Sequence, residues 1–436
     1  MLPTRRLLLL LLVPAVLLAL ASLESVFLAL AALALLATLA AVGVDLALLP
    51  RPRAVSVQRR HEPRLSLGAD NLIRLDLENA APRPLRFVLR DETPPECTAS
   101  LVYLPGVAPA AGRTTLRYTL RPRRRGDHQF GDVALRWDSP LGLLRRQATL
   151  PLAAPVKVYP NLLEVRKYDL LARRGRLQEA GLRASRRFGT GTEFESLREY
   201  TPDDDYRRIN WKATARRGRP MTAEFETERS QNVLAVLDAG RLMATEVGGL
   251  TKLDHALNTS LLLAYVAALR GDRVGLLAFS DRVLAYLPPR RGRRAFLSML
   301  ATLYNLAPEP VEPDFDRALQ FLATRQMRRS LLVLFTDLTD RDVSSALVQH
   351  LTRLARRHLA VCVTLADPAV LAAATATPAT TAAVYERVVA ARLLEERGEV
   401  LGALRQRGAI TLDVPADRLT VAVVNKYLEL KARTRL

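Results

Sequence analysis

Two long apolar stretches at the start of the chain predict membrane-spanning helices. Leu7–Leu23 and Ser25–Val44 carry no charged residue, and only Glu24 lies between them. A helix of about 20 apolar residues crosses a bilayer, so residues 1–50 are expected to form a transmembrane helical hairpin with a short turn. A signal peptide ending near Ala21 is the alternative for the first stretch, but it leaves the second unexplained.

Arginines on both sides of these stretches set the expected orientation. Arg5 and Arg6 precede the first stretch, and Arg51 and Arg53 follow the second. Positive charge is retained on the cytoplasmic side of a membrane, so both ends of the hairpin and the rest of the chain are expected in the cytoplasm.

Alternating apolar and polar positions predict a β domain after the membrane segment. The alternation is clear in Ile73-Leu75-Leu77 and in Val133-Leu135-Trp137, and clusters such as Thr93-Pro94-Pro95 mark turns between short strands. Short strands with turns at this spacing are typical of an antiparallel sandwich. We therefore assign residues 51–160 to a small all-β sandwich.

The pattern changes to continuous apolar runs in residues 231–436. The runs are Val233–Leu237, Val274–Phe279, Leu331–Phe335 and Leu359–Leu365, and helical patterns lie between them. Uninterrupted apolar strands alternating with helices indicate a parallel, doubly wound α/β sheet that is covered on both faces. A last amphipathic helix is predicted over Leu419–Leu430.

Acidic residues follow three of these predicted strands. Asp238, Asp281 and Asp337 each come at or just after a strand end, and Thr336 precedes the third. The carboxyl ends of parallel strands share one edge of the sheet, where oxygen ligands could hold Mg²⁺. The alternative is that each acid caps the helix that follows.

Composition and charge narrow the function classes. The net charge is +20, but it is spread along the chain rather than gathered in one arm, and no nucleic-acid-binding motif is present. With 2 Cys and 5 His there is no disulfide framework and no zinc signature. Dispersed positive charge suits a protein held near an anionic lipid surface.

The segment over residues 161–230 connects the two predicted domains and contains the most distinctive stretch. Acidic and basic residues interleave there with Phe194, Tyr200 and Trp211. The acids upstream can neutralise the basic run, so an internal acid–base latch that ties the segment to a domain is favoured over an RNA-stacking surface.

The stretch Leu197–Arg216 resembles the signature of the bacterial "domain of unknown function 58" family. Further blocks agree, among them Asp138–Leu143, Gly271–Val283 and Leu331–Leu338. The resemblance implies a von Willebrand factor A-like C-terminal domain and a membrane-anchored accessory protein of the bacterial inner membrane. The signature residues assigned to interaction are Glu199, Tyr200, Asp204, Asp205, Arg207, Trp211 and Arg216.

The resemblance also bears on metal and partners. Metal-binding von Willebrand A domains use an Asp-x-Ser-x-Ser loop with a distal Thr and Asp. Here Asp238, Thr336 and Asp337 match this pattern, but Gly240 and Leu242 stand in place of the serines. The metal site is therefore expected to be degenerate. No cofactor is expected, and Mg²⁺ is the alternative. Members of the family are commonly encoded beside MoxR-type AAA+ ATPases, which implies such a partner.

We therefore expect a non-enzymatic protein-interaction module that presents its strand-end crevice to a partner. It is expected to act with a MoxR-type ATPase and other membrane-associated proteins in the assembly or maturation of envelope or enzyme complexes. A metal-dependent phosphohydrolase using Asp238, Asp281 and Asp337 is one alternative. Nucleic-acid binding at the membrane is another, and it predicts a steep dependence on salt.

Overall fold

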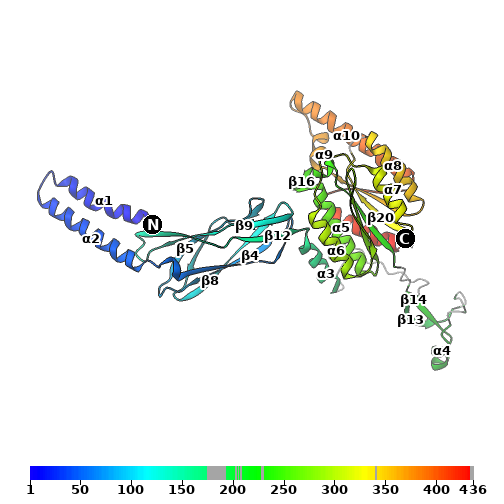
Figure 1. Cartoon of the computed structure of the whole chain (residues 1–436), viewed down its shortest axis with the longest axis horizontal. Helices are drawn as coiled ribbons and strands as arrows, with labels where there is room; N and C mark the ends of the chain where they lie inside the picture. Colours follow the sequence, from blue (N-terminus) through cyan, green and yellow to red (C-terminus); the bar gives the residue numbers. More distant parts are fainter. Residues whose placement is uncertain are drawn as a thin grey trace. The chain divides into compact units, whose positions relative to one another are not determined.

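The computed structural model describes residues 1–173, 193–201, 204, 206, 209–226, 230–338 and 341–432. The chain divides into two compact units, Met1–Tyr159 and Pro160–Leu436. Figure 1 colours the chain from blue at its N-terminus to red at its C-terminus.

Two apolar helices begin the first unit and pack against each other (Figure 1). Helix α1 (Arg5–Leu20) contains Pro14, and helix α2 (Val26–Leu48) follows after a short turn. By length and composition α2, at 23 residues, could cross a membrane, whereas α1 has 16 residues and is shorter than a typical span. One span is thus supported among the described residues, and the second span and the orientation stay predictions.

The rest of the first unit is β structure in three sheets. Their strand orders are β1-β11-β10-β5-β7, β2-β4-β8-β6 and β3-β12-β9, and all pairs are antiparallel except β3 with β12. The strands are β1 (Leu2–Pro3), β2 (Val55–Arg60), β3 (Arg64–Ser66), β4 (Asn71–Asn79), β5 (Leu85–Asp91), β6 (Cys97–Ala99), β7 (Leu104–Ala108), β8 (Gly112–Pro122), β9 (Gly126–Phe130), β10 (Val133–Asp138), β11 (Leu144–Leu150) and β12 (Ala154–Tyr159).

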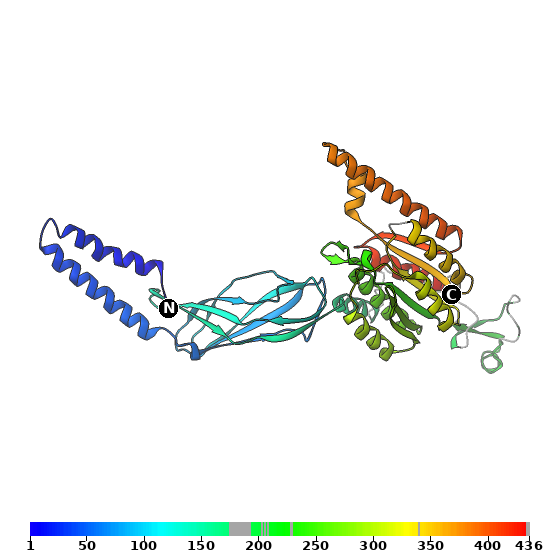
Figure 2. The same ribbon diagram turned by 45° about the horizontal axis from the view of Figure 1, so that its top comes forward.

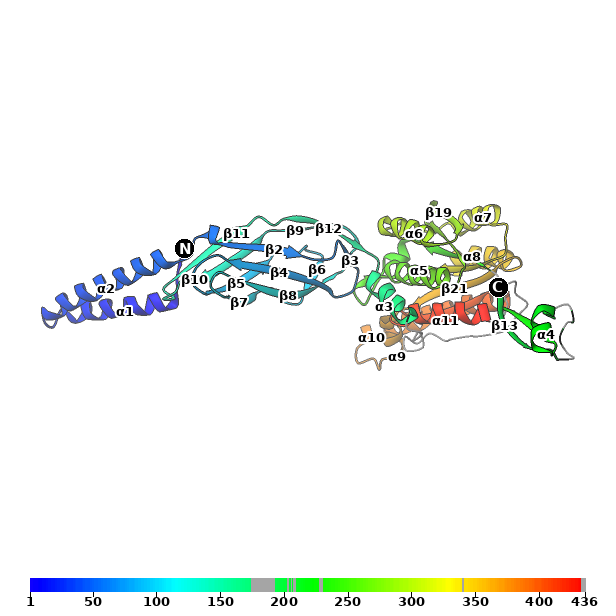
Figure 3. The ribbon, with the colours of Figure 1, turned by 90° about the horizontal axis from the view of Figure 1, so that it is seen from below.

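The alternating positions of the sequence form the core of this β structure. Ile73, Leu75 and Leu77 of β4 are fully buried, as is Leu135 of β10, while Arg74 between the first two is exposed. The strands of this β structure can be followed in Figure 3. Burial of this apolar face is the main driving force for pairing the strands in this register.

A mainly parallel sheet of six strands forms the centre of the second unit. Its order is β19-β18-β15-β20-β21-β22, and only the edge strand β19 is antiparallel to its neighbour. The four predicted apolar strands are confirmed as β15, β18, β20 and β21. The strands are β15 (Asn232–Asp238), β18 (Arg273–Phe279), β19 (Val283–Arg290), β20 (Ser330–Phe335), β21 (Leu359–Ala366) and β22 (Ile410–Pro415).

Helices cover both faces of this sheet (Figure 2). On one face α7, α8 and α10 pack over a buried apolar cluster, and on the other α5 packs against the sheet, α6 and α11. The predicted final helix is confirmed as α11. The helices are α3 (Leu162–Arg173), α5 (Lys252–Leu269), α6 (Arg293–Asn305), α7 (Phe315–Arg325), α8 (Arg341–Ala355), α9 (Pro368–Thr375), α10 (Thr381–Gln406) and α11 (Leu419–Ala432).

A small hairpin forms part of the connecting segment. Strands β13 (Glu193–Glu199) and β14 (Met221–Glu226) pair in antiparallel fashion, and the short helix α4 (Trp211–Arg217) lies between them in the chain. A second, two-residue pair is formed by β16 (Glu246–Val247) and β17 (Leu250–Thr251). We call residues 193–226 the signature hairpin.

The buried carboxylate of Asp45 attaches α2 to the loop between β10 and β11. Asp45 is fully buried and accepts four hydrogen bonds from the loop. The donors are the Ser139 hydroxyl and the main-chain N–H groups of Leu141, Leu143 and Leu144. Thr4, at the start of α1, donates its hydroxyl proton to the Gly142 carbonyl oxygen at 2.6 Å. Both helices are thereby joined to one loop.

Asp45→Ala should loosen this junction, because four donors, two of them in buried hydrogen bonds, then lose their acceptor. We expect the free energy of opening of β10 and β11 to fall by about 3 kcal/mol. Hydrogen exchange of their amides, in the full chain held in detergent, measures it. The control is Asp70→Ala, which removes an exposed pair with Arg121 and should change stability by less than about 1 kcal/mol. Equal effects of the two substitutions would contradict the attachment.

Candidate functional site

The strand-end residues Asp238 and Thr336 meet at one edge of the six-stranded sheet. β15 ends at Asp238 and β20 ends just before Thr336, and these two strands are parallel neighbours. The Thr336 hydroxyl donates to Oδ2 of Asp238 at 2.6 Å, and the Gly240 N–H donates to Oδ1 at 2.7 Å. Both oxygens of this buried carboxylate thus have a neutral donor.

Asp337, the next residue, is held by two buried cations instead. The Lys252 ammonium lies 2.5 Å from its Oδ2, and the Arg397 guanidinium lies 2.6 Å from its Oδ1. Lys252 begins α5 and Arg397 lies in α10, so the contact joins three elements. All three side chains are at least nine-tenths buried, which makes the contact internal to the protein.

Arg397 also extends the network to the last strand of the sheet. Its second terminal nitrogen donates to the Asp413 carboxylate at 2.7 Å and to the Leu365 carbonyl oxygen at 2.8 Å. Thr364 donates to the same Asp413 oxygen at 2.8 Å. The carboxyl ends of β20, β21 and β22 are therefore linked by one guanidinium.

Asp238 differs from Asp337 in that no cation contacts it among the described residues. The pKa of Asp238 is raised to about 6, chiefly by burial and in smaller part by the charges of Asp337 and Glu312, against the opposing effect of the hydrogen bonds from Thr336 and Gly240. A carboxyl group in this environment changes its protonation state in the mildly acidic range.

The backbone leaves no room for a side chain at position 240. A Cβ atom built on Gly240 would lie 2.9 Å from Pro313 Cδ and 3.0 Å from the Val311 carbonyl oxygen. A serine would therefore need the chain to move. Leu242, at the other predicted serine position, lies in a 3₁₀ turn over Arg241–Ala244. Neither Gly240 nor Leu242 offers a side-chain oxygen to this edge of the sheet.

Asp281, the third strand-end acid, is not brought to the other two. Its side chain is half exposed, lies 2.9 Å from the Arg282 guanidinium and accepts from the Ser280 hydroxyl at 3.0 Å. In the described part of the chain, no group of three or more His, Cys, Asp or Glu could hold a metal ion.

The sequence led us to expect that the strand-end acids contact a partner protein, and the burial of these acids contradicts that expectation. Asp238 is 1% exposed and Asp337 is 4% exposed, so neither carboxylate can form a contact surface in this structure. The predictions missed Lys252 and Arg397, which neutralise Asp337. Arg397 is 60 residues from Asp337 in the chain, and no local pattern signals their contact.

The predicted acid–base pairing in the connecting segment lies within the signature hairpin itself. Asp204 pairs with Arg198 and also accepts from the Thr201 hydroxyl at 2.9 Å, and these hydrogen bonds hold the pKa of Asp204 far below its usual range. Glu199 lies 3.0 Å from Arg219. These pairs brace the hairpin; they do not connect it to the sheet.

The remaining signature residues divide into anchored and exposed ones. The Tyr200 N–H donates to the Pro220 carbonyl oxygen at 2.9 Å, which extends the pairing of β13 and β14 by one step toward the segment between them. Trp211 begins α4 and is 70% exposed, and Arg216 is exposed in the last turn of the same helix. Asp205 and Arg207 lie outside the described residues.

Comparisons with known proteins define a class for this chain. Residues 196–374, about two fifths of the chain, match the family model described as "Protein of unknown function DUF58", so this part of the chain is similar to that bacterial family. An uncharacterized protein of Mycobacterium tuberculosis is 26% identical over 182 residues, which is 41% of this chain and 56% of that protein. Uncharacterized protein YeaD of Bacillus subtilis is 29% identical over 201 residues, or 44% and 50%. The chain thus matches about half the length of these relatives.

Solved structures add little to this identification. The proximal thread matrix protein 1 of the mussel byssus gives a TM-score of 0.27 at 10% identity, covering 47% of this chain and 46% of that one. The CARDB domain of PF1109 from Pyrococcus furiosus gives 0.18 at 10% identity, covering 25% and 89%.

Asp337→Asn should destabilise the second unit strongly, because it leaves two buried cations without their shared anion. We expect a loss of about 3–5 kcal/mol in the free energy of opening of β20. Hydrogen exchange of the β20 amides in the full chain measures it. Asp281→Asn is the matched control and should have a much smaller effect, because its side chain is half exposed. Adding Lys252→Met to Asp337→Asn should recover part of the lost free energy. If Asp337→Asn lowers the free energy of opening no more than Asp281→Asn does, the proposed network of charges is contradicted.

The raised pKa of Asp238 predicts that stability falls as pH rises. The folded pKa of about 6 exceeds the ordinary value of 3.8, so this group's contribution is complete below about pH 4 and is lost as pH passes 6. The loss should be about 2–3 kcal/mol. Hydrogen exchange of the β15 amides, corrected for intrinsic rates, should show this trend in the wild type and in Asp281→Asn. In Asp238→Asn the trend should be absent, and its persistence there would assign it to another group.

Proposed function

We propose that the chain is a membrane-anchored, cytoplasm-facing protein-interaction module rather than an enzyme. In this proposal it acts with a MoxR-type AAA+ ATPase in the assembly or maturation of envelope or enzyme complexes. The observation that carries the non-enzymatic part is the pairing of Asp337 with Lys252 and Arg397, because both of its oxygens are already bound by cations of the protein. A divalent ion bound by Asp337 would have to displace a buried ammonium or guanidinium group.

The anchoring part rests on the two N-terminal helices. α2 is long and apolar enough to span a bilayer, and most leucines of α1 are exposed, as they would be against lipid. Arg5 and Arg6 at one end of the hairpin, and Arg51 and Arg53 at the other, support a cytoplasmic location for both ends by the positive-inside rule. The loop that receives Asp45 would then lie at the membrane surface.

The fold part of the proposal is a von Willebrand factor A-like domain for residues 231–436. It is supported by a mainly parallel sheet with helices on both faces and by Asp238 at the end of a central strand. At the sheet edge, Asp337 is bound by protein cations and the serine positions carry no hydroxyl group. In this proposal the domain is therefore a degenerate form that binds its partner without a metal ion.

The interaction part rests on the signature hairpin. Trp211 is an exposed aromatic side chain, and Lys212, Arg216 and Arg217 are exposed on the same short helix. Exposed Trp and Arg are the residue types that most often dominate protein–protein binding energy. A basic surface with one large aromatic side chain suits an acidic patch on a partner. The choice of a MoxR-type ATPase rests on the family resemblance.

Trp211→Ala should weaken partner binding while leaving the fold intact, because the side chain is exposed and makes no described hydrogen bond. We expect the affinity of the full chain, in detergent, for a MoxR-type AAA+ ATPase from the same genome to fall at least about tenfold. Tyr385→Ala removes an equally exposed aromatic side chain from α10 and is the matched control. Absence of ATPase binding by the wild type, or equal binding by both variants, would sink the proposal.

A further inference from the structure

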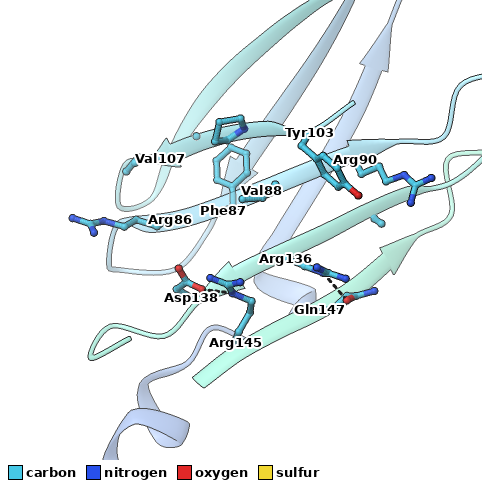
Figure 4. A pocket seen from close by; sticks show the side chains of 13 residues that line it. Arg86, Phe87, Val88, Arg90, Tyr103, Val107, Arg136, Asp138, Arg145 and Gln147 are labelled. Carbon is cyan, nitrogen blue, oxygen red and sulfur yellow. Dashed lines mark hydrogen bonds and ion pairs between the residues drawn. The ribbon is translucent and has the colours of Figure 1, made fainter. Parts of the chain in front are cut away.

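A cavity of about 570 Å³ is hollowed into the outer face of the β11-β10-β5-β7 sheet (Figure 4). Four arginines line it: Arg86 and Arg90 of β5, Arg136 of β10 and Arg145 of β11. They reach this face because side chains alternate along a strand, so that Phe87 and Leu89 point into the core between the exposed residues of β5. The cavity is large enough for a small organic ligand.

The cavity carries excess positive charge. Asp138 is the one acidic residue in its lining, and it lies 2.6 Å from Arg145. Arg136 donates to the side-chain oxygen of Gln147 at 2.7 Å, which leaves its charge unbalanced. Arg86 and Arg90 have no carboxylate partner among the described residues. The lining therefore supplies three guanidinium charges for an anion.

Apolar and aromatic side chains complete the lining. Val88 lies between the two free arginines on β5, and Tyr103 and Val107 are more than half exposed at the rim (Figure 4). Arginine forks beside a tyrosine and aliphatic surface suit a ligand with a phosphate group and an adjoining hydrocarbon part. A fully hydrated inorganic anion would make no use of the apolar rim.

The strands that carry the cavity are hydrogen-bonded to the residue that follows the end of α2. The carbonyl oxygen of Pro50 accepts hydrogen bonds from the Trp137 indole N–H at 3.2 Å and from the Arg146 guanidinium at 2.9 Å. Trp137 and Arg146 are the direct neighbours of Arg136 and Arg145 on the strands under the cavity. Pro50 lies two residues after Leu48, the last residue of α2. If α2 spans the bilayer, Pro50 lies at the level of the lipid headgroups, which form a layer about 5–8 Å thick on each side.

We infer that this cavity binds the phosphate-bearing headgroup of an anionic phospholipid in the leaflet where α2 ends. The inference rests on the membrane anchoring of the proposed function. The positive charge of the lining favours an anionic ligand. Because the cavity is expected to lie at the level of the lipid headgroups, a lipid is favoured over a soluble acidic polypeptide. The bound headgroup would fix the angle at which the β domain leaves the membrane.

Energy transfer from a single tryptophan tests the inference in the full chain. Trp211→Phe leaves Trp137, in β10 beneath the cavity, as the one tryptophan of the sequence. This chain is reconstituted into vesicles of unlabelled phosphatidylcholine. One sample contains a trace of phosphatidylglycerol with dansyl on an acyl chain, and the other contains a trace of phosphatidylcholine labelled in the same way. We expect stronger transfer to the phosphatidylglycerol, with about fivefold enrichment for each free arginine.

Two double variants localise the effect. Arg86→Gln with Arg90→Gln should abolish the excess transfer to phosphatidylglycerol. Arg74→Gln with Arg117→Gln removes the same charge from exposed positions on the other sheet and should leave the excess unchanged. Equal losses in both variants would mean general attraction to an anionic surface and would overturn the site.

Other outcomes separate this inference from the proposed anchoring. If the chain floats with the vesicles but transfers equally to both lipids, the headgroup site is wrong and the anchoring stands. If the chain does not float with vesicles, the anchoring fails, and the inference with it. Loss of the excess with inorganic phosphate or hexaglutamate, but not with sodium chloride of equal ionic strength, would reassign the cavity to a free anion or an acidic polypeptide.

Discussion

The second unit depends on how the buried charge of Asp337 is balanced. One of its cations, Lys252, comes from α5 on one face of the sheet, and the other, Arg397, comes from α10 on the opposite face. A single carboxylate at the end of β20 therefore joins both helical layers across the sheet edge. Such a pair need not add net stability over apolar packing, but removing one partner leaves a charge without compensation. The layers are consequently held in one arrangement.

Three buried aspartates show three ways of meeting the same desolvation cost. Asp337 uses cations, Asp45 uses a hydroxyl and three main-chain N–H groups, and Asp238 uses two neutral donors and keeps a raised pKa. The differences follow from what each location offers. A loop that wraps around Asp45 presents main-chain donors, whereas Asp238 lies at the end of an apolar strand, with only the adjoining loop and Thr336 within reach.

The sequence predicted elements well and side-chain partners poorly. Continuous apolar runs such as Leu331–Phe335 have one favourable environment, the centre of a covered sheet, so four strands of the second unit were predicted correctly. Edge strands such as Val283–Arg290, which contains two prolines, have weaker patterns and were missed. The partners of Asp337 could not be predicted, because Lys252 and Arg397 reach it only through tertiary packing, and each alone reads as an ordinary surface cation.

The acids at the sheet edge bind groups inside the protein, so a partner must be recognised elsewhere on its surface. With Asp238 and Asp337 buried, the polar groups left to meet a partner are the exposed ones, and the two most distinctive sets are both basic: the arginines around the β-domain cavity and the residues near Trp211. Guanidinium groups bind phosphate and carboxylate oxygens in pairs and lose less hydration than ammonium groups. An excess of arginine over lysine therefore favours anionic partners for both surfaces, a lipid at one and an acidic protein patch at the other.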